Sequence, residues 1–296
     1  MPPSSPSDRG GVGVSVVVPV YDDQRNLEIC LSALARQTLA GAAFEVVVVD
    51  NGSRPAMVLP DLPALQARLV QCPTAGSYAA RNAGARLARG EVIAFLDADC
   101  APAPDWLETG LDALRSAPPQ TLIGGEVQFV ASENPGAVEL FQRLCIPGQR
   151  HNIEQQKFSV TANLFVRKAE TLDIGEFDER LYSGGDKEWC WRALGRGFEL
   201  RHCPGARVVT AHRKTLAAAI RSTRRVTGGQ YRMRERNFAA PSAPNGSPPG
   251  FLRRLRQSGL PPFARARVLA VAVVLKIVQR LEIARLAAGV GKESRA

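Results

Sequence analysis

Two carboxylates, Asp97 and Asp99, stand one residue apart at the end of the apolar segment Phe95-Leu96. Side chains two positions apart on an extended strand point to the same side, so both carboxylates can converge on one cation. Mg²⁺ and Mn²⁺ favour oxygen ligands, and the phosphate oxygens of a substrate often complete the shell. The pattern therefore indicates an enzyme that handles a nucleoside diphosphate, although a solvated strand-to-loop turn can have the same sequence.

The elements that must position these carboxylates alternate along the first part of the chain. We expect strands over residues 14–20, 44–49, 69–72 and 91–96, and helices over residues 22–37 and 78–88. This alternation predicts a parallel sheet with helices on both faces. Ligands bind beyond the carboxyl ends of the strands in such sheets. Asp22 and Asp50 also follow predicted strands and are expected at the same edge.

The second part of the chain is less regular. We expect strands over residues 122–130, 159–167, 198–202 and 206–210, and helices over residues 186–195, 215–236 and 263–288. Residues 239–250 are rich in Pro, Ser and Gly, which is typical of a linker. The predicted organisation is a flexible leader (1–12), a catalytic domain (13–236), a Pro-rich linker (237–261) and a C-terminal helix (262–296).

Charge is distributed unevenly between these parts. Residues 205–296 hold 19 Lys and Arg against 3 Asp and Glu, whereas residues 1–204 hold 19 against 25. A basic C-terminal region suits an anionic membrane surface, a nucleic acid or an anionic substrate. The apolar run over residues 268–275 is too short to span a bilayer. The last helix is therefore expected either to lie at a membrane interface or to pack on protein, within the chain or across a dimer.

The cysteines and the N-terminal residues bear on location. The six cysteines form no C-x-x-C pair, and residues 1–13 contain no apolar signal segment. We therefore expect reduced thiols, no zinc site and a cytoplasmic protein. The basic C-terminal region extends this prediction to a peripheral position on the inner face of the cell membrane.

Eight segments together resemble the family 2 glycosyltransferases of the GT-A fold. They run in the family's order: residues 14–21 (VSVVVPVY), 48–53 (VVDNGS), 76–84 (GSYAARNAG), 89–91 (RGE), 96–99 (LDAD), 162–168 (ANLFVRK), 175–179 (GEFDE) and 184–189 (GGDKEW). The resemblance covers about residues 12–236. It implies an α/β, Rossmann-like and mostly parallel sheet flanked by helices, with the basic helical region as an extension.

The resemblance also implies roles for individual residues. It assigns the nucleotide pocket to Pro19, Tyr21, Asp22, Asp50, Arg81 and Asp97. It assigns a Mn²⁺ or Mg²⁺ ion to Asp97 and Asp99, with His212 as a third ligand. Arg213 and Lys214 follow His212 and are candidates for gripping the diphosphate.

A catalytic base is expected in the last of these segments. A carboxylate there would remove the proton from the acceptor hydroxyl as that oxygen attacks the anomeric carbon. The family often has Glu-Asp at this point, whereas this chain has Gly185-Asp186, so both Asp186 and Glu188 are candidates. The register favours Asp186, which would also stand near the start of a helix, where it is a common N-cap.

These residues predict an inverting glycosyltransferase that moves a sugar from a nucleotide-sugar, most simply a UDP-sugar, to a carbohydrate or lipid-linked acceptor. One alternative is a sugar nucleotidyltransferase, but the first strand is followed by residues 21–24 (YDDQ) rather than by a Gly-rich basic loop. A basic membrane-binding or nucleic-acid-binding module is the other alternative. It does not explain the acidic strand ends, and the scarcity of aromatic residues (6%) argues against a nucleic-acid partner.

Overall fold

A computed structural model describes residues 12–39, 43–236, 238 and 250–290. Its centre is an eight-stranded sheet in the order β3-β2-β1-β4-β7-β6-β8-β5. The strands are β1 (Val14–Val20), β2 (Phe44–Asp50), β3 (Ala67–Gln71), β4 (Val92–Leu96), β5 (Ala101–Pro102), β6 (Thr121–Val130), β7 (Asn163–Arg167) and β8 (Glu199–Ala211). Strands β1 to β4 are parallel, whereas β7 runs antiparallel to β4 and β6, and β5 antiparallel to β8. The fold is the predicted mixed α/β architecture.

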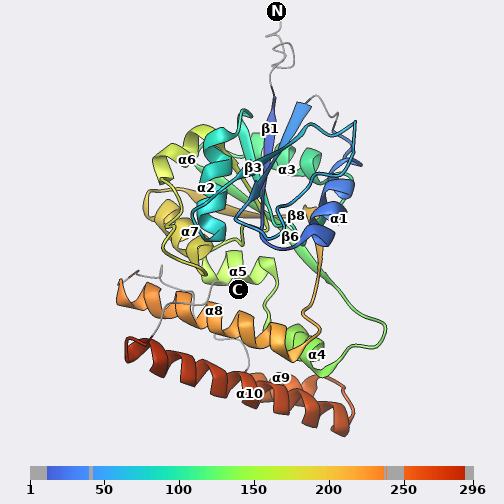
Figure 1. The fold of residues 1–296 in the computed structure, drawn as a ribbon, viewed down its shortest axis with the longest axis vertical. Coiled ribbons are helices and arrows are strands. Elements are labelled where there is room, and N and C mark those ends of the chain that lie inside the picture. Colours follow the sequence, from blue (N-terminus) through green and yellow to red (C-terminus); the bar gives the residue numbers. More distant parts are fainter. Residues whose placement is uncertain (1–11, 40–42, 237, 239–249, 291–296) are drawn as a thin grey trace, which may run out of the picture.

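Helices cover both faces of this sheet (Figure 1). They are α1 (Gln24–Leu34), α2 (Ser77–Leu87), α3 (Trp106–Arg115), α4 (Ala137–Cys145), α5 (Gln149–Gln156), α6 (Lys168–Ile174), α7 (Gly185–Gly195), α8 (Leu216–Glu235), α9 (Phe251–Gln257) and α10 (Pro262–Ala287). Helix α1 begins where the Asp23 side chain accepts a hydrogen bond from the Asn26 backbone N–H, a standard N-cap.

The alternation of side chains along the strands builds one core on each face of the sheet. On β1, Val16 and Val18 belong to the core that packs against α1, while Val17 joins the other core with Phe177 and Trp189. All seven residues of β1 and of β2 are buried, as expected for central parallel strands. This rigid centre fixes the strand ends from which the acidic residues project.

The structure differs from the predicted elements in several places. The two strands expected at 198–202 and 206–210 form one strand, β8, whose pairing with β6 shifts register between Gly125 and Glu126. Helices α3 to α6 were not predicted. Helix α9 lies inside the expected linker 237–261, whereas residues 239–249 lie outside the described part of the chain.

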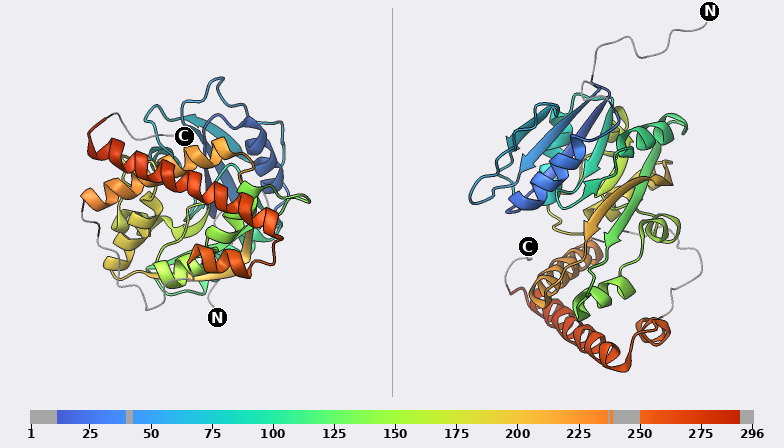
Figure 2. Two further views of the ribbon diagram at one scale, coloured as in Figure 1. Left: turned by 90° about the horizontal axis from the view of Figure 1, so that it is seen from below. Right: turned by 90° about the vertical axis from the view of Figure 1, so that its right-hand side faces the viewer.

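A separate helical layer lies below the sheet, with α8 between the α/β body and α10 (Figures 1 and 2). A small core holds it together: Val138 of α4, Ala219 of α8, and Val271 and Leu275 of α10 are buried against one another. One face of α10 thus packs within its own chain. None of the helices in the described residues is long and apolar enough to cross a bilayer.

Candidate active site

The acidic strand ends meet at one edge of the sheet. Val20 pairs with Asp50 at the ends of β1 and β2, and Asp97 directly follows β4, which pairs with β1. Because these strands are parallel, their carboxyl ends lie at the same edge, where open α/β sheets bind ligands. The structure therefore brings Asp22, Asp50 and Asp97 to one side of the molecule.

Asp50 organises the loop after β2. It is buried, and its carboxylate accepts hydrogen bonds from the backbone N–H groups of Ser53 (2.9 Å) and Met57 (3.1 Å) and from the Gln71 side chain (3.0 Å). Burial opposes ionisation, but these hydrogen bonds outweigh it and lower the pKa of Asp50. Asp50, the residue that the resemblance places against the nucleotide base, thus holds the loop after β2 in place.

The first loop is joined to the second through Asp22. The Asp22 backbone N–H donates to Ser53 Oγ (2.9 Å), and its side chain accepts from the Arg54 backbone N–H (2.8 Å). Next to it, Tyr21 is 40% exposed, so its ring is accessible to a ligand, whereas Pro19 is buried in β1. The loop after β1, which carries Tyr21 and Asp22, is therefore joined to the loop after β2 by hydrogen bonds.

A continuous chain of contacts connects the strand end to the predicted base. The Arg81 guanidinium forms an ion pair with Asp97 and lies 5.4 Å from the centre of the Tyr78 ring. The buried Tyr78 hydroxyl donates a hydrogen bond to Asp186 Oδ1 (3.3 Å). A Cβ at Gly185 would lie 2.7 Å from this ring, so glycine is required for the approach of the two segments. The D-x-D segment and the segment of the predicted base thus share one site.

Asp99 lies beside Asp97 in this site. The Asp99 side chain is exposed at the surface, but many protein atoms surround its carboxylate. This desolvation, together with the negative charge of Asp97, raises the pKa of Asp99 to about 6. Two carboxylates that repel each other in this way form an oxygen-rich site that favours a divalent cation. The positive charge of Arg213 acts on Asp99 in the opposite direction.

His212, the predicted third ligand, is buried. Its ring stacks on Phe129 with centroids 4.3 Å apart, and its buried Nδ1 has no hydrogen-bond partner. Burial lowers the pKa of His212, so the neutral ring is favoured. Within the described residues, no group of three or more His, Cys, Asp or Glu side chains is arranged to hold a metal ion. The donors that do lie together are the oxygens of Asp97 and Asp99.

Asp186 and Glu188 have different surroundings. Asp186 lies in the first turn of α7, whose N-cap is Gly184, so the expectation that Asp186 caps the helix was wrong. Burial raises the pKa of Asp186 above its ordinary value, against the opposing effects of the Lys187 backbone N–H, Arg81 and Tyr78. The buried Glu188 carboxylate instead forms two hydrogen bonds with Arg192 (2.8 and 2.9 Å).

Two further polar contacts support the framework. Asn82 exchanges hydrogen bonds with the backbone of Phe177 (both 2.9 Å), which fixes α2 against the segment before α7. His202 of β8 contacts Glu126 of the neighbouring strand β6 (2.8 Å). Sequence reasoning gave Tyr78 no role. Its position one helical turn before Arg81 does indicate that the two side chains lie on the same face of α2.

Comparisons with known proteins agree with this geometry. The model of Glycosyl transferase family 2 matches residues 15–166. Glycosyltransferase AglE of Haloferax volcanii is 36% identical over 198 residues, which cover 63% of this chain and 63% of that protein. Pre-mycofactocin glycosyltransferase of Mycobacterium tuberculosis is 31% identical over 223 residues, which cover 73% of this chain and 45% of that protein. The chain thus spans less than two thirds of the length of these relatives.

Solved structures resemble the fold. The mannosyltransferase PcManGT from Pyrobaculum calidifontis, in complex with GDP-Man and Mn²⁺, superposes with a TM-score of 0.55 at 20% identity, covering 96% of this chain and 77% of that chain. Residues 1–349 of S. aureus TarS, in complex with UDP, superpose with a TM-score of 0.51 at 20% identity, covering 73% and 64%. These likenesses show the GT-A fold. By its fold and by the match of the family model, the chain belongs to Glycosyl transferase family 2.

Proposed function

We propose that this chain transfers a sugar from a nucleoside diphosphate sugar, a UDP-sugar in the first instance, to a hydroxyl group with inversion at the anomeric carbon. The observation that carries this proposal is the contact chain from Asp97 through Arg81 and Tyr78 to Asp186. It connects the strand edge where nucleotides bind to a second, separate carboxylate. Inverting transfer needs a base for the acceptor hydroxyl and a group that stabilises the departing diphosphate, and these two carboxylate sites could serve the two purposes.

The donor side of the site is built from the strand ends. The loops held by Asp22 and Asp50 would receive the nucleoside, with the exposed Tyr21 ring beside the base. Asp97 and Asp99 would hold Mn²⁺ or Mg²⁺, and the oxygen donors present suit either ion. When bound, such an ion neutralises charge that develops on the departing diphosphate. The complexes of similar structures with UDP and with GDP-Man and Mn²⁺ support this proposal.

The acceptor side is built from the start of α7. Asp186 would take the proton of the acceptor hydroxyl as that oxygen bonds to the anomeric carbon and the bond to the diphosphate breaks. A raised pKa brings a carboxylate closer to the operating pH, which improves a general base. Glu188 is the weaker candidate, because Arg192 occupies both of its oxygens.

Replacing Tyr78 with Phe tests this electrostatic arrangement. The Tyr78 hydroxyl stabilises the charged form of Asp186, so its removal should raise the pKa of Asp186 further. The base works only when it is deprotonated, and transfer is therefore lost as the pH falls through this pKa. The acid limb of the kcat/KM profile should move to higher pH in Tyr78→Phe, with little change at the plateau. If the acid limb does not move, the Tyr78 hydroxyl does not influence the pKa of the base.

A donor panel tests the proposed function itself. Release of nucleoside diphosphate would be measured from UDP-, GDP-, TDP- and CDP-sugars with Mn²⁺, with and without simple sugar acceptors. We expect release from UDP-sugars that an acceptor stimulates, and we expect Asp186→Asn to lose most of this stimulation. Release of pyrophosphate from a sugar phosphate and UTP would instead identify a nucleotidyltransferase.

We also propose that the helical layer seats the enzyme on an anionic membrane surface, near a carbohydrate or lipid-linked acceptor. The side of α10 turned away from its own core carries an exposed apolar stripe, Leu269, Val273, Ile277 and Leu281. Within residues 250–290, eight Lys and Arg accompany one acidic residue, Glu282, which is buried and paired with Arg285. Apolar insertion and attraction to anionic lipid would act together on such a surface.

Sedimentation with vesicles tests this placement. The full chain should pellet with vesicles rich in phosphatidylglycerol, and added salt should weaken the binding because it screens the basic residues. Ile277→Glu/Leu281→Glu should lose most of the pelleted fraction. The matched control, Leu87→Glu/Leu172→Glu, adds the same charge at exposed apolar positions on α2 and α6 and should still pellet. Equal loss in both variants, or a salt-resistant dimer formed through α10, would contradict membrane seating.

A further inference from the structure

A lysine without a carboxylate partner directly follows the proposed base. The Lys187 Nζ lies 4.5 Å from the centre of the Phe158 ring and 5.5 Å from the centre of the Trp191 ring. It also donates a hydrogen bond to the side-chain oxygen of Gln156 (3.2 Å). We call these four residues the Lys187 cage. Among the described residues, no carboxylate lies within ion-pair distance of this amine, and Asp186 acts on it only through its charge from farther away.

The Lys187 cage is held together by a contact between α5 and α7. Trp191 Nε1 donates to the carbonyl oxygen of Gln156 (3.0 Å), so the indole of α7 is fixed against the end of α5. Phe158 is buried, whereas the side chains of Lys187, Trp191 and Gln156 are partly exposed. The ammonium is thus held in a defined position and is accessible to a ligand.

Helix stability does not explain the position of this lysine. Lys187 lies in the first turn of α7, where the helix macrodipole disfavours a positive charge. Burial lowers the pKa of Lys187, so the protein environment also disfavours its charged form. The aromatic faces attract the ammonium but carry no net negative charge. An anionic group on a ligand would offset both effects.

Two other cations near the start of α7 already have carboxylate partners. The Arg81 guanidinium pairs with Asp97, and the Arg192 guanidinium pairs with Glu188. A ligand anion would have to compete with these carboxylates for either arginine. The amine of Lys187 presents no such competition, and a lysine ammonium binds carboxylates and phosphates as a compact point charge.

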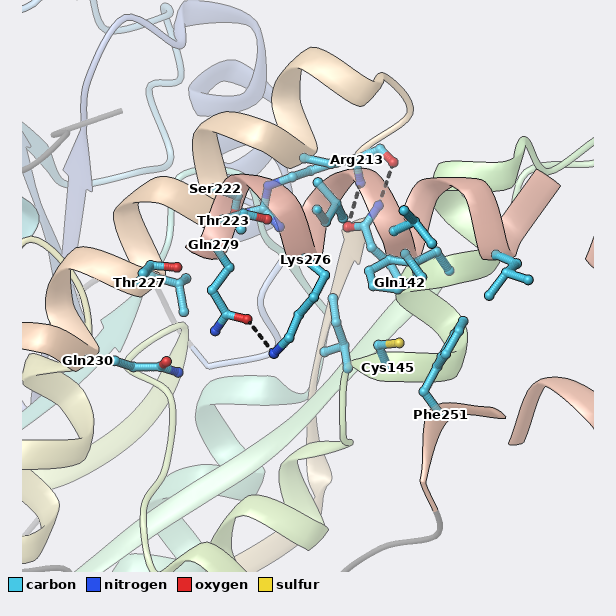
Figure 3. A pocket seen from close by; sticks show the side chains of 18 residues that line it. Gln142, Cys145, Arg213, Ser222, Thr223, Thr227, Gln230, Phe251, Lys276 and Gln279 are labelled. Carbon is cyan, nitrogen blue, oxygen red and sulfur yellow. Dashed lines mark hydrogen bonds between the residues drawn. The ribbon is translucent and has the colours of Figure 1, made fainter. Parts of the chain in front are cut away.

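A third cation, Arg213, belongs to a different part of the molecule. It lines a cavity of about 610 Å³ between α4, α8 and α10, and Gln142 forms two hydrogen bonds with its backbone (2.6 and 3.2 Å), as Figure 3 shows. The described residues that line this cavity include none of the Lys187 cage. The cage is therefore a separate place at which a ligand bound to Asp186 can be recognised.

We propose that the Lys187 cage binds an anionic group, a carboxylate or a phosphate ester, on the acceptor sugar whose hydroxyl group reaches Asp186. The enzyme would thereby select acidic sugars as acceptors, with the Trp191 ring as an apolar face beside the sugar. The inference rests on the proposed function, because it names the acceptor class for the same transfer. The anionic group takes no part in bond formation: the acceptor oxygen bonds to the anomeric carbon, the diphosphate leaves, and Asp186 takes the proton.

Tryptophan fluorescence of the full chain tests this binding without turnover. The chain has three tryptophans, of which Trp106 and Trp189 are buried and Trp191 is partly exposed. Because the Lys187 ammonium lies beside the Trp191 ring, an anion bound to it changes the charge next to this indole. Titration of the emission therefore reports an affinity at the Lys187 cage.

Matched sugars serve as the probes. Methyl β-glucuronide is compared with methyl β-glucoside for a carboxylate, and glucose 6-phosphate with glucose for a phosphate. We expect at least one of the anionic sugars to bind about tenfold more tightly than its neutral partner, the gain expected from a charge-assisted hydrogen bond. Equal affinities within both pairs would overturn the proposal, as would acetate or inorganic phosphate binding as tightly as the anionic sugars.

Two glutamine variants provide a matched comparison. Lys187→Gln removes the ammonium of the cage, whereas Lys157→Gln removes one at the C-cap of α5, outside the cage. The preference for the anionic sugar should disappear in Lys187→Gln and persist in Lys157→Gln. Lys187→Arg keeps the charge and should retain most of the preference, which separates recognition of an anion from support of the fold. Equal loss in both glutamine variants would contradict binding at the cage.

Release of nucleoside diphosphate in the donor panel, measured on the unmodified chain with the same sugars as acceptors, separates this proposal from the proposed function. Preferential binding of an anionic sugar without donor consumption would support the anion site and overturn the transferase function. Donor consumption that anionic and neutral sugars stimulate equally would support the transferase function and overturn the anion site.

Discussion

Asp186→Asn should lower the rate of sugar transfer by about 10²–10⁴-fold, the usual contribution of a positioned general base. The substitution keeps the size of the side chain and its capacity to accept from the Tyr78 hydroxyl and the Lys187 backbone N–H. Affinity for the nucleotide-sugar should therefore change little, because the donor residues lie at the strand ends. Steady-state kinetics with saturating donor, together with calorimetric titration of UDP, would separate the two effects.

Glu188→Gln is the control for this prediction. The Glu188 carboxylate is buried with Arg192, which also donates to the carbonyl oxygens of Ile174 (2.7 Å) and Glu176 (2.7 Å). Loss of its charge should reduce the free energy of unfolding by roughly 1–3 kcal/mol. The folded fraction should retain most of its turnover. A larger loss of turnover in Glu188→Gln than in Asp186→Asn would move the base to Glu188.

Asp99→Asn should lower transfer by about 10²–10³-fold, because a bound cation contributes several kcal/mol and each 1.4 kcal/mol is tenfold in rate. The substitution removes one of the two carboxylates that would hold Mn²⁺ or Mg²⁺. A chelator should abolish turnover of the unmodified chain, and Mn²⁺ or Mg²⁺ should restore it. Mn²⁺ titrations of both chains would show the weaker affinity of the variant.

Asp112→Asn provides the matched control for the metal prediction. Asp112 is a 69% exposed carboxylate on α3 that pairs with Arg115. It should retain full turnover and the same Mn²⁺ dependence. Full turnover of the unmodified chain in chelator would remove the metal from the mechanism.

The central strands and the positions of the acidic residues were predictable from local sequence. Valine-rich runs give strands that are buried on both faces, and the residues that follow them must lie at the carboxyl edge of the sheet. The positions of Asp22, Asp50 and Asp97 followed from this rule. The different surroundings of Asp186 and Glu188 were partly predictable, since Glu188 and Arg192 have the i, i+4 spacing of a helical ion pair.

Other features depend on contacts between distant segments and have no local signal. Tyr78 reaches Asp186 across 108 residues of sequence, and Arg213 approaches Asp99 only after β5 pairs with β8. Strand β8 was divided in the prediction because Pro204 and Gly205 resemble a turn, whereas pairing with β6 keeps the strand continuous. Helix α5 has few apolar residues, so no helical periodicity marked it.

The most direct test of inverting transfer at this site is the anomeric configuration of the product. The full chain would be incubated with Mn²⁺, a UDP-sugar of α configuration and an acceptor found in the donor panel, and the first product formed would be examined by proton NMR. We predict a β-linked sugar, because one carboxylate, Asp186, activates the acceptor for a single displacement. An α-linked product would show retention and contradict the assignment of Asp186 as the base of an inverting enzyme.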